Sequence, residues 1–272
     1  MQQMNKRNSF SFTGVALLLT SLLVMTGCGV NNVSPGATAG NTPPAQSQKI
    51  LKVGTDPTFA PFEFKDEKDQ LTGFDADLMN AIGADMGYTV KVDSSSFDGL
   101  IPSLQAGRYD AIIAAMTITD ARAKNVLFSD KYLMATQYIA TKKDSKIKTV
   151  EDLKGKRVGV QNSTTGQTVL EKLGMVPKKY DTVPDALTDL MNGGLDAVVA
   201  DSPVVLYFIK QNPESNVQYI KGDFPKEYYG IAFKLGNQAL DDKVNASLKK
   251  LKENGKYNKI YKKWFNEDAP KL

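Results

Sequence analysis

Arg122 stands in a stretch whose residue types suit the binding of a carboxylate. The stretch, residues 114–130, reads AAMTITDARAKNVLFSD, and its start continues an apolar segment, Ala111–Met116, that predicts a buried strand. α/β proteins place ligand-contacting groups at the carboxyl ends of such strands. A guanidinium matches a carboxylate with two parallel hydrogen bonds. Arg122 is therefore a candidate anchor for a ligand carboxylate, and a surface ion pair with Asp120 or Asp130 is the ordinary alternative.

Three other predicted strands are also followed at once by polar residues. These strands and their polar segments are Ile50–Thr55 with Asp56, Arg157–Val160 with residues 161–165, and Ala197–Ala200 with Asp201. Residues 161–165 precede a predicted helix, Gly166–Leu173, whose free N–H groups favour an anion. We expect Thr164 or Thr165 to donate to the same carboxylate as Arg122, and a simple helix cap is the alternative.

Two phenylalanines, Phe59 and Phe97, lie close to these segments in the sequence. An aromatic ring that faces a cleft stacks on the flat or aliphatic part of a ligand and accepts a cation as well as an amide. The alternative for both rings is packing in a hydrophobic core. Asp56 has the alternative role of a turn residue before Pro57. Ser202 is the predicted cap of a helix that opens with Pro203, and capping that helix is the alternative role of Asp201.

The order of predicted elements favours an α/β fold, because strands alternate with helices along residues 49–272. Asp75 is expected to cap a helix that ends at Gly87, and Tyr109–Met116 reads as a central strand. Thr149 and Asp152 have the spacing of a capping box. Two amphipathic helices are predicted at the end of the chain, Gln238–Glu253 and Lys256–Phe265.

Composition excludes several classes of function. The 272 residues include 34 Lys and Arg against 30 Asp and Glu, with no continuous basic run, so a nucleic-acid partner is not expected. The absence of histidine excludes an imidazole base or ligand. The single cysteine, Cys28, excludes an internal disulfide and a cysteine-based metal site. We expect neither a cofactor nor a bound metal.

The N-terminal residues form a targeting segment. Lys6 and Arg7 precede an apolar run, Val15–Met25, that is short for a membrane-spanning helix. The run ends in Met-Thr-Gly before Cys28, which resembles a bacterial lipoprotein signal. That resemblance implies that residues 1–27 are removed and Cys28 is lipidated. A plain secretory signal and an uncleaved anchor are the alternatives.

Residues 28–48 are predicted to be a flexible tether. Gly29–Gln48 is rich in Asn, Pro, Gly, Ala, Thr, Ser and Gln and contains no charged residue, so it cannot bury a core. A lipid on Cys28 followed by a slack tether predicts a protein held at the outer face of the bacterial cell membrane, with its folded part in water.

The motif TITDAR followed by FSD resembles the signature of the polar amino acid-binding family of extracellular solute receptors, which serve ATP-driven importers. The resemblance runs from about Lys49 to the end of the chain. It implies a two-lobed, periplasmic-binding-protein-like (type II) α/β fold with two crossover hinge strands, near Leu133–Gln137 and Glu227–Tyr229. Lobe 1 would be residues 49–134 plus 229–272, and lobe 2 residues 135–228.

The same resemblance implies a role for each candidate residue. The side-chain pocket of the ligand would be formed by Asp56, Phe59, Phe97 and Gln161. The ligand's backbone would be held by Ala115, Met116, Thr117 and Arg122, by Thr164 or Thr165 from the opposite lobe, and by Asp201, which would accept from the α-ammonium. Because Arg122 and Asp201 lie on different lobes, a zwitterion would favour the closed arrangement of the two lobes.

The ligand expected from the sequence is a free polar L-amino acid. DPTFAPFEF, FDGLIP and Tyr257–Phe265 resemble glutamine receptors, whereas ATQ at residues 135–137 with Gln161–Gln167 resembles receptors for arginine, lysine and histidine. A pocket for a basic side chain needs carboxylates, which Asp56 with Glu63 or Asp98 could supply. Glutamine is favoured here, with basic amino acids as the alternative.

The expected partners are a membrane permease and its ATPase subunit, because the chain carries no Gly-x-x-x-x-Gly-Lys phosphate-binding loop of its own. An enzyme such as a dehydratase in the same cleft is the distant alternative and would need a positioned general acid or base. A sensory module that reports the same ligand is a third hypothesis.

Overall fold

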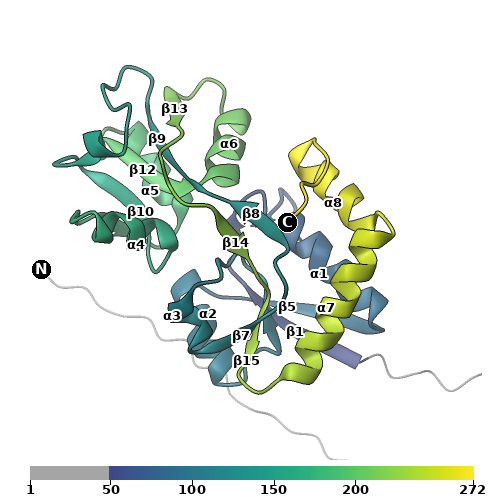
Figure 1. Cartoon of the computed structure of the whole chain (residues 1–272). Coiled ribbons are helices and arrows are strands. Elements are labelled where there is room, and N and C mark those ends of the chain that lie inside the picture. Colours follow the sequence, from purple (N-terminus) through teal and green to yellow (C-terminus); the bar gives the residue numbers. More distant parts are fainter. Residues whose placement is uncertain (1–48) are drawn as a thin grey trace, which may run out of the picture. The chain divides into compact units, whose positions relative to one another are not determined.

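The computed structural model of the chain describes residues 49–272. The predicted signal segment 1–27, the lipidation at Cys28 and the tether 28–48 lie outside the described residues. Two five-stranded sheets organise the described part, and each is the centre of one lobe (Figure 1).

The sheet of the first lobe has the strand order β5-β1-β6-β15-β7. Its strands are β1 (Lys49–Thr55), β5 (Tyr88–Ser94), β6 (Ala111–Ile112), β7 (Val126–Phe128) and β15 (Ala232–Lys234). β1 pairs in parallel with β5 and β6, and β15 pairs antiparallel with β6 and β7. A small antiparallel sheet of β2 (Thr58–Phe59), β3 (Glu63–Lys65) and β4 (Leu71–Thr72) follows β1 in the chain.

The sheet of the second lobe has the strand order β11-β10-β12-β9-β13. Its strands are β9 (Gln137–Lys142), β10 (Val158–Gln161), β11 (Lys178–Tyr180), β12 (Ala197–Asp201) and β13 (Val217–Ile220). β10 pairs in parallel with β11 and β12, and β9 pairs antiparallel with β12 and β13. In both sheets, four strands therefore run in the same direction, and the strand in the fourth position, β15 or β9, runs opposite to them.

The chain passes between the sheets twice, through β8 (Leu133–Ala135) and β14 (Glu227–Tyr229). These two strands pair antiparallel with each other, with Ala135 opposite Glu227. They form the ribbon between the two sheets in Figure 1. The two predicted crossings fall on these strands, and the lobe boundaries at 134/135 and 228/229 stay a prediction.

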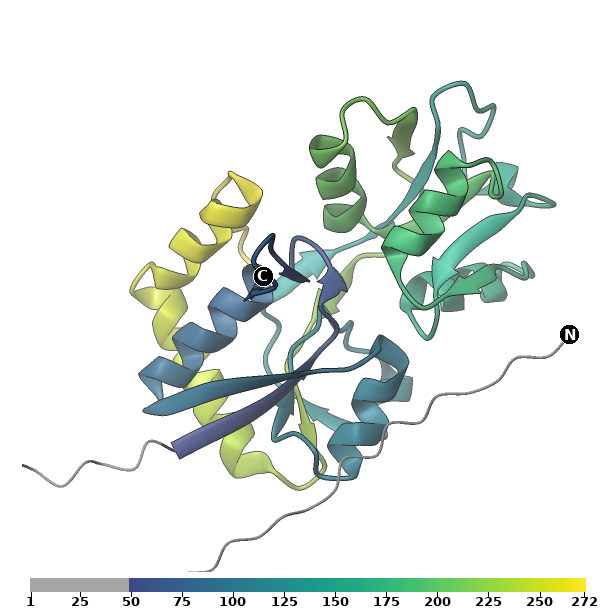
Figure 2. The same cartoon turned by 180° about the vertical axis from the view of Figure 1, so that it is seen from behind.

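Helices cover both faces of each sheet. In the first lobe, α1 (Phe74–Asp85), α7 (Gln238–Glu253) and α8 (Lys256–Phe265) lie together on one side, and α2 (Phe97–Gln105) and α3 (Asp120–Ala123) lie on the other (Figure 1 and Figure 2). The second lobe has a short 3-10 helix, Glu151–Leu153, and the helices α4 (Thr165–Lys172), α5 (Val183–Met191) and α6 (Ser202–Gln211).

Alternation along β12 shows why both faces are covered. Val198 and Ala200 belong to the core cluster that contains the buried residues of α5 and α6, whereas Ala197 and Val199 belong to the cluster that contains Leu170 of α4. Successive side chains of a strand point to opposite faces, so this strand, which is apolar up to Asp201, needs a helix on each side. Among residues 49–272, no helix is both long and apolar enough to cross a membrane.

Three local predictions need correction. Only Ala111–Ile112 of the predicted strand Tyr109–Met116 is regular, because the chain turns away from the sheet before Ala115. Asp75 lies in the first turn of α1 and does not cap it, since Gly73 occupies the cap position. The cap position of α6 is Asp201 and not Ser202.

Candidate functional site

Arg122 lies on α3, the short helix that follows the Thr-Ile-Thr segment. Its guanidinium donates one hydrogen bond to the carbonyl of Thr117 (2.8 Å) and another to the carbonyl of Ser163 in the second lobe (3.0 Å). Neither Asp120 nor Asp130 forms an ion pair with it in the described chain. The surface ion pair is therefore wrong as an account of Arg122, which bridges the two lobes.

The Arg122 guanidinium lies next to the ring of Phe97, and its burial changes its pKa. The carbon of the guanidinium lies 5.1 Å from the centre of the Phe97 ring, within the range of a cation–π contact. Burial lowers the pKa of Arg122, while the negative charges of Asp201 and Glu227 act in the opposite direction. Phe97 therefore contacts Arg122 and also packs, half-buried, against the core cluster that contains Leu100 and Leu104.

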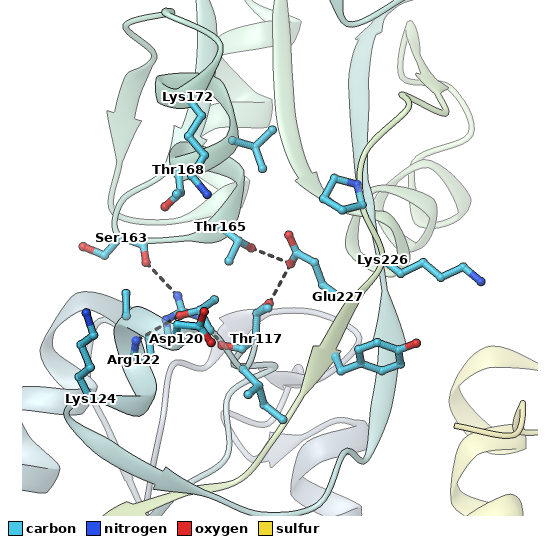
Figure 3. Close-up of a pocket in the computed structure, with 16 residues that line it drawn as sticks. Thr117, Asp120, Arg122, Lys124, Ser163, Thr165, Thr168, Lys172, Lys226 and Glu227 are labelled. Carbon is cyan, nitrogen blue, oxygen red and sulfur yellow. Dashed lines mark hydrogen bonds between the residues drawn. The ribbon is translucent and has the colours of Figure 1, made fainter.

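Glu227 of β14 connects the hydroxyl groups of both lobes. Its Oε2 accepts hydrogen bonds from Thr117 Oγ1 (2.9 Å), Thr165 Oγ1 (2.7 Å) and Gln137 Nε2 (3.3 Å). Thr117 belongs to the first lobe and Thr165 to the second, and Glu227 itself lies on a crossover strand. Two residues predicted to hold the ligand's backbone thus meet at one carboxylate oxygen (Figure 3).

Asp201 is buried at the end of β12, and its side chain does not cap α6. Gln137 Nε2 donates to Asp201 Oδ1 (2.6 Å), and the Tyr229 hydroxyl donates to Asp201 Oδ2. Burial raises the pKa of Asp201 to about 7, and the charge of Glu227 contributes in the same direction. The capping alternative is therefore wrong.

A chain of hydrogen bonds joins Arg122 to Asp201. Arg122 donates to the Thr117 carbonyl, the Thr117 hydroxyl donates to Glu227, and Gln137 donates to both Glu227 and Asp201. The positive charge of Arg122 also lowers the pKa of Asp201, which places the two groups within electrostatic reach of each other. The predicted cation and anion therefore belong to one cluster at the junction of the lobes.

Asp56 and Gln161 meet across the lobes. Gln161 Nε2 donates to Asp56 Oδ2 (2.9 Å) and to the carbonyl of Asp181 (3.0 Å). Asp56 also accepts from the Thr58 hydroxyl (2.8 Å) and from the backbone N–H of Phe97. Burial raises the pKa of Asp56. The Gln161 Oε1 atom is buried without a hydrogen-bond donor.

Phe59 is buried, with a 7% exposed fraction, and its ring stacks on Phe62 with centroids 6.2 Å apart. Phe59 belongs to a core cluster and does not line the cavity described below. Of the two further carboxylates named for a basic side chain, Glu63 is fully buried beside Asp75, whereas Asp98 is exposed and accepts from Asn162 of the second lobe (3.2 Å).

The backbone at Ala115 is left-handed, with φ 44°, a conformation that is rare for a residue with a side chain. Its N–H donates to Asp75 Oδ2 (2.7 Å), and the Tyr132 hydroxyl donates to the same oxygen (2.7 Å). Asp75 thus holds the bend that ends the short strand. The carbonyl of Met116 accepts from Gly230 (3.1 Å), and the Met116 side chain is buried in the core.

Glu63 is buried against Asp75. As a carboxylate it has no hydrogen-bond donor for either oxygen, whereas as a neutral acid it can donate to Asp75. Burial, followed by the negative charge of Asp75, raises the pKa of Glu63 well above its ordinary value. Burial therefore favours the neutral form of Glu63, which contacts Asp75, over a charge offered to a ligand.

Thr164 and Thr165 begin α4 in different roles. Thr164 occupies the cap position, where its hydroxyl accepts from the N–H of Gln167 (3.4 Å) and donates to the carbonyl of Gln161 (2.8 Å). Thr165 points to Glu227. The N–H groups of Thr165 and Gly166 have no acceptor among the described residues, as is usual in the first turn of a helix.

A cavity of about 820 Å³ opens at this junction. Figure 3 shows Thr117 and Arg122 on one side of it, Ser163, Thr165, Thr168 and Lys172 on the other, and Glu227 between them. Of the predicted site residues, the cavity wall contains Thr117, Arg122 and Thr165. The Asp56–Gln161 contact and Asp201 lie outside this wall.

Comparison with known proteins agrees with this geometry. A model of the bacterial extracellular solute-binding proteins, family 3, matches residues 51–267. The chain belongs to this family. Its members are extracytoplasmic, and the curated relatives below are amino acid-binding proteins of ABC transporters, so this family 3 protein is an amino acid-binding component of such a transporter.

Curated relatives of the family 3 protein differ in the amino acid that their names give. A probable histidine-binding protein of Neisseria gonorrhoeae is 36% identical over 260 residues, covering 93% of this chain and 95% of the relative. The arginine-binding periplasmic protein of Mannheimia haemolytica is 39% identical and covers 81% and 92%. The glutamine-binding protein GlnH of Bacillus subtilis is 41% identical and covers 73% and 74%.

Solved structures show the same range of ligands. An ancestral arginine-binding protein bound to glutamine is 46% identical, with a TM-score of 0.78, and covers 82% of this chain and all (100%) of the ancestral one. The ancestral arginine-binding protein bound to arginine has the same identity and a TM-score of 0.77, and covers 81% and 100%. The arginine-, lysine-, histidine-binding protein ArtJ of Geobacillus stearothermophilus is 43% identical, has a TM-score of 0.79, and covers 82% and 98%.

Sequence reasoning missed four residues of the site, namely Gln137, Ser163, Glu227 and Tyr229. Glu227 stands in the segment PKEYYG, where a lysine precedes it and nothing in the local pattern indicates burial. Its exposed fraction is only 8%, because β14 pairs with β8 between the lobes. The predicted crossover segments do contain Gln137, Glu227 and Tyr229, so their position between the lobes could have indicated these three residues.

Proposed function

We propose that this family 3 protein captures a free basic L-amino acid, with arginine the first candidate, and delivers it to the permease of an ABC importer. The observation that carries the choice of ligand is the environment of Asp56. This carboxylate is buried, its partners are the uncharged donors of Thr58, Gln161 and Phe97, and no cation pairs with it in the described chain. A buried carboxylate is stabilised most by a cation.

The charges around the site support the same choice. Asp56, Asp201 and Glu227 are three acids at the junction of the lobes. Arg122, Lys124, Lys172 and Lys226 line the cavity, but none of them forms an ion pair with these acids in the described chain. A ligand with a second cationic group balances these charges better than a neutral side chain does. The guanidinium or ammonium of the ligand would bind Asp56, and the ring of Phe97 offers a cation-accepting face nearby.

The ligand's backbone would bind at the cluster around Glu227. Its carboxylate would accept from Arg122, from the hydroxyl of Thr165 and from the free N–H groups at the start of α4. The α-ammonium would donate to Asp201 and to the carbonyl of Ala115, which accepts from no described donor. Met116 would help to shape the bend that presents this carbonyl.

Lobe closure would couple binding to delivery. Arg122 and Asp56 lie on the first lobe, whereas Asp201, Thr165 and Gln161 lie on the second, so a zwitterion contacts all of them only when the lobes are together. Ligand binding would therefore shift the population to the closed form, which the permease would recognise. Lipidation of Cys28 would hold the protein at the outer face of the cell membrane, with residues 28–48 as its tether.

Glutamine is the second candidate and is the ligand favoured by the sequence motifs. The buried Gln161 Oε1 supports it, since this oxygen lacks a donor that a ligand amide could supply. An ancestral arginine-binding protein that is 46% identical was solved with each of the two amino acids. No enzymatic step is proposed, although one structural neighbour is a precursor of cyclohexadienyl dehydratase.

Calorimetry with the purified protein tests the proposal. We expect arginine to bind more tightly than glutamine, and the variant Asp56→Asn to lose about 30-fold or more of its affinity for arginine because a charged partner is removed. The same variant should change the affinity for glutamine by about threefold or less. Glutamine binding more tightly than arginine, or equal losses for both in Asp56→Asn, would overturn the choice of ligand.

A further inference from the structure

Glu227 is a charged residue at the junction of the two lobes. It belongs to β14, one of the two crossover strands, and its side chain enters the wall of the 820 Å³ cavity together with Thr117, Arg122 and Thr165. Figure 3 shows its carboxylate between the residues of the two lobes. The Glu227 carboxylate therefore lines the cavity between the two lobes.

The two oxygens of Glu227 have different surroundings. Oε2 accepts from the hydroxyls of Thr117 and Thr165 and from the Gln137 amide, so its capacity is used by the protein. Oε1 accepts from no donor in the described chain, and it is not among the sealed polar atoms that lack a partner. The bonds to Oε2 fix the orientation of the carboxylate, and Oε1 remains free to accept a hydrogen bond from a molecule in the cavity.

The charge of Glu227 points to a cationic donor. No lysine or arginine forms an ion pair with Glu227 or with Asp201 in residues 49–272. Both carboxylates contact the same Gln137 amide, at 3.3 and 2.6 Å, so they face one small region. One ammonium placed there would neutralise the repulsion between two neighbouring acids.

We propose that Glu227 is a ligand-binding residue that shares the α-ammonium of the amino acid with Asp201 through its Oε1 atom. This inference rests on the proposed function, since it assigns one group of the amino acid that the site binds. Glu227 thereby gives the site specificity for α-amino acids over the corresponding acids without an amine. Through Oε2 it also fixes the Thr117 and Thr165 hydroxyls that surround the ligand's backbone.

The test compares ligands with and without the amine. Calorimetry measures the affinity of the protein for arginine and for δ-guanidinovalerate, and in parallel for glutamine and for glutaramate. The variants are Glu227→Gln, which keeps an oxygen for the two threonines, and Asp201→Asn. Glu171→Gln is the matched control, because it removes an exposed carboxylate on α4 that pairs with Lys179 outside the cavity wall.

Glu227→Gln should weaken the binding of the amino acid about 10- to 100-fold, because one hydrogen bond between charged groups is lost. It should change the affinity for the amine-free analogue by about threefold or less, and Asp201→Asn should give the same pattern. Glu171→Gln should leave all affinities unchanged. Wild-type protein should itself prefer each amino acid over its amine-free analogue.

Two results would overturn the inference. Equal losses for the amino acid and its analogue in Glu227→Gln would show that Glu227 only braces the hinge, and unchanged affinity for both would show that it has no part in binding. The choice of arginine can fail alone, because the glutamine pair then carries the same comparison. If wild-type protein binds neither amino acid, the proposed function is wrong and the inference fails with it.

Discussion

Replacing Arg122 with alanine separates ligand binding from folding more sharply than any other change at the site. The Arg122 side chain donates two hydrogen bonds to carbonyls, at Thr117 and Ser163, and makes a cation–π contact with Phe97. The Arg122 side chain is half-buried, so in the alanine variant water can replace part of the hydrogen bonding that the Thr117 and Ser163 carbonyls lose. We therefore expect Arg122→Ala to lower the free energy of unfolding by no more than about 2 kcal/mol.

The expected loss in binding is larger. The ligand carboxylate would keep only the Thr165 hydroxyl and the free N–H groups of α4, and it would be enclosed between the lobes without its cation. Truncation of one partner in an enclosed charge pair costs about 2–5 kcal/mol, which corresponds to a Kd about 30- to 5,000-fold higher. Arg122→Lys keeps the charge but not the planar fork, so it should fall between wild type and Arg122→Ala.

Calorimetry with arginine and glutamine measures the binding term, and urea unfolding without ligand measures the folding term. Arg157→Ala is the matched control, because Arg157 forms a two-point ion pair with Asp196 on the second lobe, outside the cavity wall. That variant should leave Kd unchanged. The role given to Arg122 is refuted if Arg122→Ala binds within about threefold of wild type, or if its folded fraction binds normally while the protein is strongly destabilised.

Two further predictions concern the buried acids. The pKa of Asp201 is about 7, and a bound ammonium favours the carboxylate form of this residue. The affinity for the amino acid should therefore rise from about pH 5.5 to about pH 8, and binding should release a proton. Calorimetry in buffers of different ionisation enthalpy measures this proton release. Because the pKa of Asp201 is raised, its contribution to the free energy of unfolding without ligand should fall as pH rises from about 4 through about 7. Asp201→Asn should flatten the pH dependence of both the affinity and the free energy of unfolding. In urea unfolding at neutral pH, Glu63→Gln should cost less than about 1 kcal/mol, because burial favours the neutral form of Glu63 and glutamine is its uncharged analogue. Asp75→Ala should cost about 2–4 kcal/mol, because it leaves the Ala115 N–H and the Tyr132 hydroxyl unpaired. Equal costs for these two variants, or a pH profile that survives Asp201→Asn, would contradict these assignments.

The two sheets give a physical reason for the position of the site. In each sheet the parallel strands end at the junction of the lobes, where Asp56 follows β1 and Asp201 ends β12. The fourth strand of each sheet, β15 or β9, is joined directly to a crossover strand. Residues at the junction therefore lie at the ends of strands from both sheets and next to the two crossover strands, β8 and β14.

Local elements were predictable because their causes are local. The helices Gln238–Glu253 and Lys256–Phe265 have the predicted bounds, since apolar residues recur at helical spacing and a glycine separates the two. The box at Thr149 and Asp152 forms as predicted, with the Asp152 carboxylate 3.0 Å from the Thr149 nitrogen and the Thr149 hydroxyl 3.4 Å from the Asp152 nitrogen. Each of these features depends on residues within about four positions of one another.

Asp75 shows where local reasoning fails. Its place at the start of an apolar helix predicted a cap, but its carboxylate accepts from Ala115, which lies 40 residues further along the chain. The strand Tyr109–Met116 was shorter than predicted for the same reason, since that bond holds Ala115 in a left-handed turn. Neither contact leaves a trace in the residues next to Asp75.

The sequence by itself determined the family, through the TITDAR and FSD motifs, and the polar residues that follow each buried strand. Only the tertiary structure decided that Glu227 gathers Thr117, Thr165 and Gln137, which lie 110, 62 and 90 positions away in the chain. The reason is that hydrogen bonds between lobes depend on where β8 and β14 carry the chain from one sheet to the other. A segment such as PKEYYG encodes its own strand, but its burial comes from the two cores that close around it.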